Sequence, residues 1–121
     1  PAFLSQKSKA YDSSAKTLAQ TAQTAAETYA TESPEGNYAE MSTSKLQAIE
    51  PSINTTNPNE AKLTVAEPIE SNAGYKVTAE AENTKDNYTI ERNKEGKLTH
   101  TCKAPAGGTG CPGHKAESSG W

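Results

Sequence analysis

Apolar residues in the first quarter of the chain recur at alternating steps of four and three, which is the period of an α-helix. No glycine and no internal proline interrupts this pattern, so we predict one helix over 1–31. Pro34 and Gly36 end the helix, because the residue before a proline is pushed out of the α region. The helix residues expected to pack on the sheet are Tyr11, Ala15, Leu18, Ala22, Ala25 and Tyr29.

The second half of the chain alternates apolar and polar residues with the period of a β-strand. Four such segments occur, at 62–66, 74–81, 87–92 and 96–101. In the second, Tyr75, Val77 and Ala79 fall on one face, and in the fourth Leu98 and His100 do. The short, turn-rich connections 83–86 and 93–96 are of hairpin length. This alternation predicts an antiparallel meander of three or four strands that is covered on one side.

The residues between the helix and the strands predict a loop with a short second helix. Ser44 and Gln47 match a capping box, and Leu46 and Ile49 lie one helical step apart. We therefore expect an α+β fold in one domain over 1–121. It divides into a helix (1–31), a connection with a short helix (32–60), an antiparallel sheet (61–101) and a cysteine loop with a tail (102–121).

The composition suggests a small core, since hydrophobic residues make up 32% of the chain and aromatic residues 6%. Cys102 and Cys111 lie close together in a segment rich in Gly and Pro, and we predict that they form a disulfide. Closing that loop would contribute about 2–3 kcal/mol and indicates an oxidising, extracytoplasmic setting. An alternative is a zinc site formed by the two cysteines with His100 and His114, although this spacing does not match common finger patterns.

The charge pattern excludes some functions and raises a question about the helix. The net charge is -3 and no block of Lys and Arg stands out, so direct nucleic-acid binding is not predicted. Residues 17–26 carry no charge, and Thr17, Thr21 and Thr24 begin a row of threonines beside the alanines. This helix is either a weakly amphipathic surface helix or one that neighbouring molecules cover on its second side.

No set of residues predicts catalysis or a cofactor. The Gly-rich segment 104–111 lacks the Lys-Ser/Thr of a phosphate loop. Glu80 and Glu82 are expected on one strand face, as a solvated pair that discourages edge-to-edge aggregation. No nucleophile–base pair is evident, so we expect no enzyme, no metal and no cofactor. Asn54 and Asn87 match the glycosylation sequon, which is frequent by chance in such a chain.

The opening of the chain resembles a known family. The stretch "PAFLSQKSKAYDSSAKT" resembles the segment that follows the apolar N-terminal part of bacterial type IV pilins. The stretch "ETYATESPEGNYAEMSTSKLQAIEPSI" is similar to the helix exit and connecting loop of major pilins from Gram-positive and actinobacterial lineages. The resemblance covers essentially the whole chain and is strongest at the N-terminal motif. It implies a pilin fold, with the helix packed on the meander and a C-terminal disulfide loop.

The resemblance also implies a function and partners. In the family, an apolar segment of about twenty residues, long enough to span a membrane, precedes the position of Pro1. The subunit would be anchored in the membrane by that segment, processed by prepilin peptidase, and polymerised with other pilin subunits by the assembly machinery. The product is a cell-surface filament for adhesion, twitching motility or DNA uptake. Residues expected to face the filament are Phe3, Leu4, Thr17, Thr21 and Thr24.

Two other functions stay open at this stage. A pseudopilin of a type II secretion system shares the helix and the sheet, but usually lacks the terminal cysteine loop and carries an acidic calcium-binding loop instead. A small secreted binding module would need a concave pocket with converging polar groups, for which the small apolar inventory offers little material.

Overall fold

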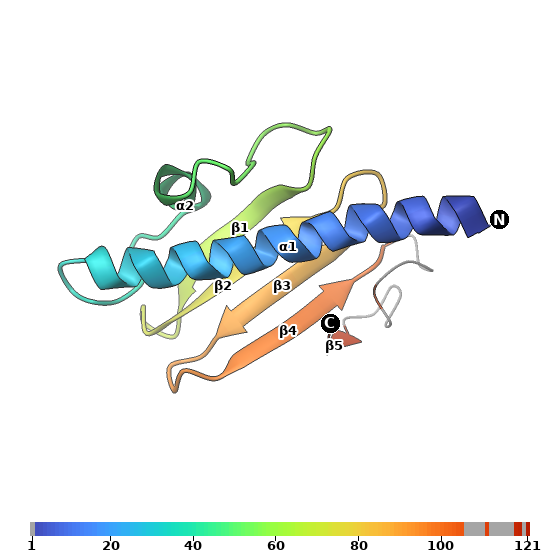
Figure 1. Cartoon of the computed structure of the whole chain (residues 1–121). Coiled ribbons are helices and arrows are strands. Elements are labelled where there is room, and N and C mark those ends of the chain that lie inside the picture. Colours follow the sequence, from blue (N-terminus) through green and yellow to red (C-terminus); the bar gives the residue numbers. More distant parts are fainter. Residues whose placement is uncertain (1, 106–110, 112–117, 120) are drawn as a thin grey trace.

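One long helix lies across one face of an antiparallel sheet (Figure 1). The computed structural model describes residues 2–105, 111, 118, 119 and 121, with side chains from Lys7 onward except those of Ser118 and Ser119. The elements are α1 (Ala2–Glu32), α2 (Thr43–Ile49), β1 (Lys62–Ile69), β2 (Gly74–Glu80), β3 (Asn87–Arg92), β4 (Leu98–Lys103) and β5 (Ser118–Ser119). The predicted α+β class, with a long helix and a four-stranded meander, is confirmed.

The strands follow one another in sequence order, each antiparallel to its neighbour. Val77 faces Ile90 across β2 and β3, and Ile90 faces His100 across β3 and β4. The strand β1 extends beyond the predicted segment and includes Pro68. Proline is tolerated there because β1 is an edge strand of the sheet. The two-residue strand β5, which pairs with β4, was not predicted from the sequence.

The core combines small side chains from α1 with large ones from the sheet. The buried helix residues are Ala15, Ala19, Ala22, Ala25, Ala26 and Ala30. The buried large side chains beneath them and from the connection are Leu46, Ile53, Leu63, Tyr75, Val77, Tyr88 and Ile90. Because alanine adds little width to the helix, these larger side chains can fill the space between the two layers at native packing density.

The helix does not cover the whole sheet. In the part of the chain that the structure describes, α1 packs over β1, β2 and β3, and α2 packs beside β1, but α1 does not reach β4. The prediction that Leu98 and His100 belong to the covered face is therefore wrong for Leu98, which is 42% exposed. His100 is half-buried because Trp121 lies against it, with ring centroids 4.8 Å apart.

The second helix begins two residues earlier than its sequence pattern predicted. Ser42, not Ser44, is the N-cap residue, and its hydroxyl accepts a hydrogen bond from the backbone N–H of Lys45 at 3.2 Å. Gln47 does not complete a capping box; its amide donates to the carbonyl of Ile53 at 2.9 Å. Gln47 thus fixes the connection to α2, which keeps buried Ile53 against the core.

The end of the domain away from the helix N-terminus is held together by bonds between its loops. Glu70, Ser71 and Asn72 in the β1–β2 turn all have positive φ, of 50°, 57° and 73°. The carbonyl of Asn72 accepts from the backbone N–H of Tyr38 at 3.1 Å, and the carboxylate of Glu70 accepts from that of Lys94. The connection after α1 and the β3–β4 hairpin therefore stabilise a turn whose backbone conformation is otherwise costly.

Candidate functional site: the surface of α1 and its anchors

The face of α1 that meets the sheet is centred on alanines. Ala15 and Ala22, both predicted to pack there, are fully buried, and Ala25 is nearly so. Ala19, Ala26 and Ala30 are also buried, although the sequence analysis did not select them. We call Ala15, Ala19, Ala22, Ala26 and Ala30 the alanine face. The unbroken recurrence of alanine at steps of three and four was the signal that could have identified it.

Three large side chains of the predicted face lie on a flank of the helix. Tyr11, Leu18 and Tyr29 are half-buried and pack against the edge of the core. Tyr11 and Leu18 border the connection between α2 and β1, and the Tyr29 hydroxyl donates to the carbonyl of Ala39. These side chains attach the helix to the connection, while the alanine face attaches it to the sheet.

The opposite side of α1 carries the row of threonines. Thr17, Thr24 and Thr31 are exposed, and Thr21 and Thr28 are half-buried; we call these five the threonine face. The hydroxyls of Thr24, Thr28 and Thr31 each donate to the backbone carbonyl four residues earlier, at 2.9–3.3 Å. Since these three donors are used within the helix, Thr24, Thr28 and Thr31 offer a partner mainly shape and methyl groups. The side chains of Phe3 and Leu4 lie outside the described residues.

A buried polar cluster anchors α1 near its N-terminal end. Asp12 is 1% exposed, and its carboxylate accepts from the Thr84 hydroxyl at 2.7 Å and from the Tyr88 hydroxyl at 2.5 Å. Asp86 is fully buried beside it, and its backbone N–H donates to Thr84. We call these four residues the proximal cluster. It ties the helix to the β2–β3 turn and to β3.

The proximal cluster places two carboxyl groups together out of water. Burial, followed by the hydrogen bond to Asp12 and its negative charge, raises the pKa of Asp86 to about 7. The same causes hold the pKa of the Tyr88 hydroxyl above its usual value. Because two adjacent buried carboxylates repel each other, the pair retains one proton under mildly acidic conditions. Neither aspartate lines any of the grooves formed by the described residues alone, so this geometry suits anchoring.

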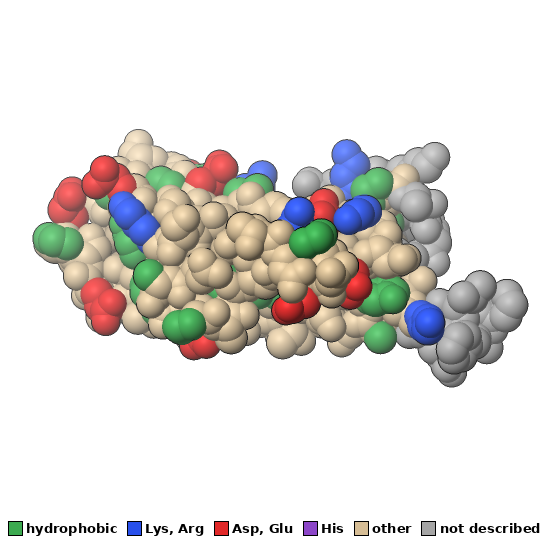
Figure 2. All heavy atoms as spheres, turned by 90° about the horizontal axis from the view of Figure 1, so that it is seen from above, with side chains coloured by type: hydrophobic (Ala, Val, Ile, Leu, Met, Phe, Trp, Pro, Cys, Tyr) green, Lys and Arg blue, Asp and Glu red, His purple; other side chains and the backbone are tan. Residues whose placement is uncertain are grey.

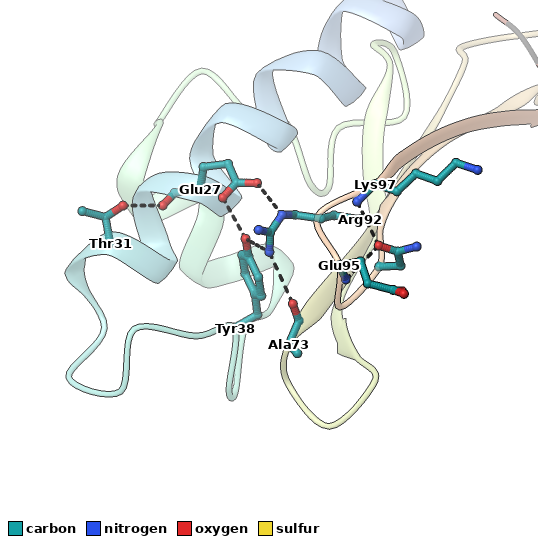
Figure 3. A network of polar contacts seen from close by, with 8 residues as sticks. Glu27, Thr31, Tyr38, Ala73, Arg92, Glu95 and Lys97 are labelled. Atoms are coloured by element: carbon teal, nitrogen blue, oxygen red, sulfur yellow. Dashed lines mark hydrogen bonds and ion pairs between the residues drawn. The ribbon is translucent and has the colours of Figure 1, made fainter.

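A second polar cluster anchors the C-terminal half of α1 (Figure 3). The Tyr38 hydroxyl donates to the Glu27 carboxylate at 2.7 Å and accepts from the Arg92 guanidinium at 3.0 Å. Arg92 also forms an ion pair with Glu27 at 3.7 Å and donates to the carbonyl of Ala73. We call Glu27, Tyr38 and Arg92 the distal cluster. Its two charged side chains reach solvent, since that of Glu27 is 48% exposed and that of Arg92 30%, whereas Tyr38 is buried.

Tyr75 packs against Tyr38 of the distal cluster. The rings of Tyr38 and Tyr75 lie 5.0 Å apart between their centroids, and the Arg92 guanidinium lies over the Tyr38 ring. Burial and the nearby Glu27 carboxylate raise the pKa of Tyr38 to about 12 and hold that of Tyr75 above its usual value. Both hydroxyls therefore stay protonated, so that Tyr38 can keep donating to Glu27.

The predicted disulfide between Cys102 and Cys111 is present, and both residues are buried. This pairing rules out the alternative in which both thiolates bind zinc, and His114 lies outside the described residues. His100 contacts Trp121, whose indole N–H donates to the carbonyl of Thr101 at 2.5 Å and whose ring meets that of Tyr88 edge-on. Cys111, through the disulfide, and Trp121 are thus both held beside the proximal cluster.

The other residues named from sequence patterns have structural surroundings. The side chain of Asn54 makes four hydrogen bonds within the α2–β1 connection, so it organises that loop. Asn87 begins β3 opposite Glu80 and Lys103. Glu80 and Glu82 do not share a strand face, because β2 ends at Glu80 and Glu82 lies in the following turn. Residues 106–110 of the Gly-rich segment lie outside the described residues.

A shallow groove of about 340 Å³ separates α1 from the connection. Tyr11 and Leu18 line one side, and Ser52, Asn59 and Glu60 line the other. Seen from above the view of Figure 1, the surface shows scattered charges of both signs and separate small hydrophobic spots (Figure 2). This view shows no large single-sign or apolar patch among the described residues that would identify a ligand.

Comparison with known proteins adds no relative. No family model, no curated protein and no solved structure matches the chain. Among the described residues, no helix has the length and apolar character needed to cross a membrane. Within the same residues, no group of three or more His, Cys, Asp or Glu side chains is placed to hold a metal ion.

Proposed function

We propose that the chain is the globular part of a structural subunit of a type IV pilin-like filament. In this proposal α1 continues upstream into an apolar segment that anchors the subunit in the membrane before assembly. Prepilin peptidase processes the precursor, and the assembly machinery polymerises it with other copies of itself. The filament stands on the cell surface and serves adhesion, motility or DNA uptake.

The observation that carries the proposal is the two-sided character of α1. Its alanine face is buried on the sheet, while Thr17, Thr24 and Thr31 of its threonine face are exposed. The threonine face lacks charges, although an exposed helix side normally carries Lys and Glu. Small, uncharged side chains suit a helix that packs closely against other helices.

Two further features support the same proposal. The disulfide holds Cys111 to β4 and a hydrogen bond holds Trp121 there, at a strand that α1 does not reach among the described residues. A subunit on the cell surface is in an oxidising environment, without the chaperones of the cell interior. In that environment a disulfide is the usual way to stabilise a domain with a small core. The two polar clusters also hold α1 at both ends of the sheet, which would keep a helix shared with neighbouring subunits in a fixed position.

The test is made in the host cell with the complete gene. We expect thin surface filaments in electron micrographs that disappear when the gene is deleted and return on complementation. Complementation with Thr24→Arg should fail, because a charge would enter the packed threonine face. The matched control is Thr99→Arg, an exposed threonine on β4, which should restore filaments. A deletion that leaves filaments intact but abolishes protein secretion would favour the pseudopilin alternative instead.

A further inference from the structure

The sheet has a second face, on the side away from α1 (Figure 1). Because side chains alternate along a strand, Lys76, Thr78 and Glu80 of β2 lie on this face, whereas Val77 and Ala79 between them belong to the core. A shallow groove of about 210 Å³ on the same side is lined by residues of all four long strands, among them Val65, Thr78, Thr89 and Thr101. We call this side of the sheet the outer sheet face.

The pairing of neighbouring strands arranges the outer sheet face in three rows. Each row takes one residue from β1, β2, β3 and β4, in that order. The central row consists of Val65, Thr78, Thr89 and Thr101. The first charged row, toward the β2–β3 turn, consists of Lys62, Glu80, Asn87 and Lys103. The second charged row, toward the β3–β4 hairpin, consists of Glu67, Lys76, Glu91 and Thr99.

The two charged rows carry opposite signs on β1 and on β2. On β1, Lys62 belongs to the first charged row and Glu67 to the second. On β2, Glu80 belongs to the first charged row and Lys76 to the second. On β3 and on β4 only one of the two rows carries a charge. No strand therefore has the same sign in both rows.

The charged side chains of both rows reach solvent. Those that are exposed are Glu67 and Lys103, and those that are half-buried are Lys62, Lys76, Glu80 and Glu91. None of the six takes part in an ion pair within the part of the chain that the structure describes. Opposite charges on neighbouring strands, such as Lys62 beside Glu80, can also stabilise a single sheet. Contacts within one sheet and contacts between two molecules therefore have to be distinguished by experiment.

We propose that two copies of the chain bind each other through their outer sheet faces, related by a two-fold axis that follows the central row. Rotation about this axis places the first charged row of each copy over the second charged row of the other, with each strand over the same strand. Lys62 then meets Glu67 of the second copy, Glu80 meets Lys76 of the second copy, and the symmetry repeats both pairs. Stacked sheets lie about 10 Å apart, a gap that a lysine and a glutamate span together.

The charges favour this arrangement over the other face-to-face dimer. A two-fold axis parallel to the strands would place each charged row over itself, with β1 over β4 and β2 over β3. Lys62 would then meet Lys103, and Lys76 would meet Glu91, so each attraction would be offset by a repulsion. The axis along the central row places no like charges directly opposite each other. Complementarity of this kind fixes the register of two partners.

The surrounding charges do not oppose the contact. At one end of the outer sheet face, the β2–β3 turn carries Glu82 and Lys85. At the other end, the β1–β2 turn and the β3–β4 hairpin carry one acidic side chain for each basic one, namely Glu70, Lys94, Glu95 and Lys97. Glu60, before β1, lines the groove beside α1 instead. Lys115 and Glu117 carry one charge of each sign and lie outside the described residues.

The contact is small, so we expect it to be weak. Four strands about 4.8 Å apart, with five residues each at about 3.4 Å, cover about 330 Å² of each copy. A stable interface buries about 800 Å² per partner. We therefore expect association at millimolar concentration and monomers at micromolar concentration. The inference concerns the opposite side of the sheet from α1 and does not depend on the proposed function.

The test uses zero-length carbodiimide coupling, which joins a lysine amine to a carboxylate only when the two touch. Isotope-labelled and unlabelled copies are mixed at millimolar concentration, coupled and digested for mass spectrometry. We expect mixed-isotope links from Lys62 to Glu67 and from Lys76 to Glu80. Within one copy the two residues of each pair lie about 13–17 Å apart along one strand, too far for direct coupling. In about 1 M salt, where the Debye length is about 3 Å, the yield should drop at least about fivefold.

Charge variants separate the dimer from the single sheet. Glu67→Lys places a lysine opposite Lys62 of the second copy, so the mixed-isotope link from Lys76 to Glu80 should fall at least about fivefold. Lys62→Glu/Glu67→Lys should recover that link, although it places like charges beside Glu80 and Lys76 within each sheet. The control Glu35→Lys makes the same charge change at an exposed position outside the outer sheet face and should couple as the unaltered chain does. Thermal melts followed by tryptophan fluorescence verify that each variant is folded.

Three results would overturn the proposed dimer. Links that form only within one copy, from Lys62 to Glu80 or from Lys76 to Glu67, would show that the charges serve the single sheet. Mixed-isotope links from Lys76 to Glu91, without the expected ones, would indicate an axis parallel to the strands. A folded Lys62→Glu/Glu67→Lys variant that couples no better than Glu67→Lys would show that these two side chains do not meet between copies.

Discussion

Asp12 and Glu27 each bind a tyrosine hydroxyl of the layer beneath α1, at 2.5 and 2.7 Å, yet their surroundings differ. The proximal cluster around Asp12 is buried and pairs a carboxylate with a second carboxyl group. The distal cluster around Glu27 reaches solvent and pairs a carboxylate with a guanidinium. The comparison indicates that burial, more than the number of hydrogen bonds, decides how much each anchor contributes to the free energy of unfolding. A buried group that loses its partner cannot bind water in its place.

Replacing Asp12 should have the largest effect. Asp12→Ala leaves the buried hydroxyl of Tyr88 and the half-buried hydroxyl of Thr84 without their acceptor, and we expect a loss of about 3 kcal/mol in the free energy of unfolding. Urea denaturation followed by the fluorescence of Trp121, which contacts Tyr88, measures this loss. Asp12→Asn, which keeps one acceptor oxygen, should lose less. A loss under about 1 kcal/mol for Asp12→Ala would show that water replaces the carboxylate.

Removing the disulfide should cost slightly less. Cys102→Ala/Cys111→Ala frees a loop of sequence separation 9, and chain entropy predicts a loss of about 2.5 kcal/mol. Since Cys102 pairs with Tyr88 across β3 and β4, this loss should couple to that of Asp12→Ala. Arg92 belongs to the distal cluster, at the other end of the helix. The stability losses from removing the disulfide and from Arg92→Ala should therefore add to within about 0.5 kcal/mol. If removal of the disulfide coupled as strongly to Arg92→Ala as to Asp12→Ala, the two clusters would not be energetically separate.

Changing the pH should affect the proximal cluster. Folded Asp86 holds its proton up to about pH 7, whereas an unfolded aspartate releases it near 3.8. Between these pH values the folded chain binds more protons than the unfolded chain, so its free energy of unfolding falls as the pH rises. Below and above this range, Asp86 makes no pH-dependent contribution to stability. We expect a decrease of about 2 kcal/mol between pH 5 and 8 in denaturation series. Asp86→Asn should remove this decrease in stability between pH 5 and 8. If the decrease is unchanged in the variant, other titratable groups cause it.

Removing the arginine of the distal cluster should have the smallest effect. After Arg92→Ala, Tyr38 still donates to Glu27, and the lost ion pair was partly exposed. We therefore expect a loss of about 1 kcal/mol, measured by urea denaturation as above. Lys94→Ala, on the neighbouring hairpin, is the control and should stay within about 0.5 kcal/mol. If Arg92→Ala costs as much as Asp12→Ala, burial is not what distinguishes the two anchors.

The regular parts of the fold could be predicted because their periodicity is local. The steps of four and three over 1–31 and the alternation around Tyr75 and Ile90 identify the helix and the meander without knowledge of tertiary contacts. The disulfide followed from two cysteines in a short Gly-rich segment. The extent of β1 was underestimated, because Pro68 is compatible with a strand only at an edge of the sheet.

The orientation of the helix and its anchors could not be predicted in the same way. The helical period favours large side chains such as Leu18 on the packed face, but large residues of the sheet already fill the core and require small residues opposite. Asp12 was not selected, since a charged helix residue is normally exposed unless partners far along the chain accept it. Those partners, Thr84 and Tyr88, are brought to Asp12 only by the assembled sheet.

The alanine face also has a mechanical consequence. Alanines protrude little, so along its middle α1 is held to the sheet by smooth contacts that resist sliding weakly. A force that pulls the N-terminal end of α1 along its axis is therefore borne at the polar clusters, and Asp12 lies nearer that end than Glu27. Under such tension the bonds of Asp12 in the proximal cluster would carry the force first, and those of Glu27 in the distal cluster would carry it after they break.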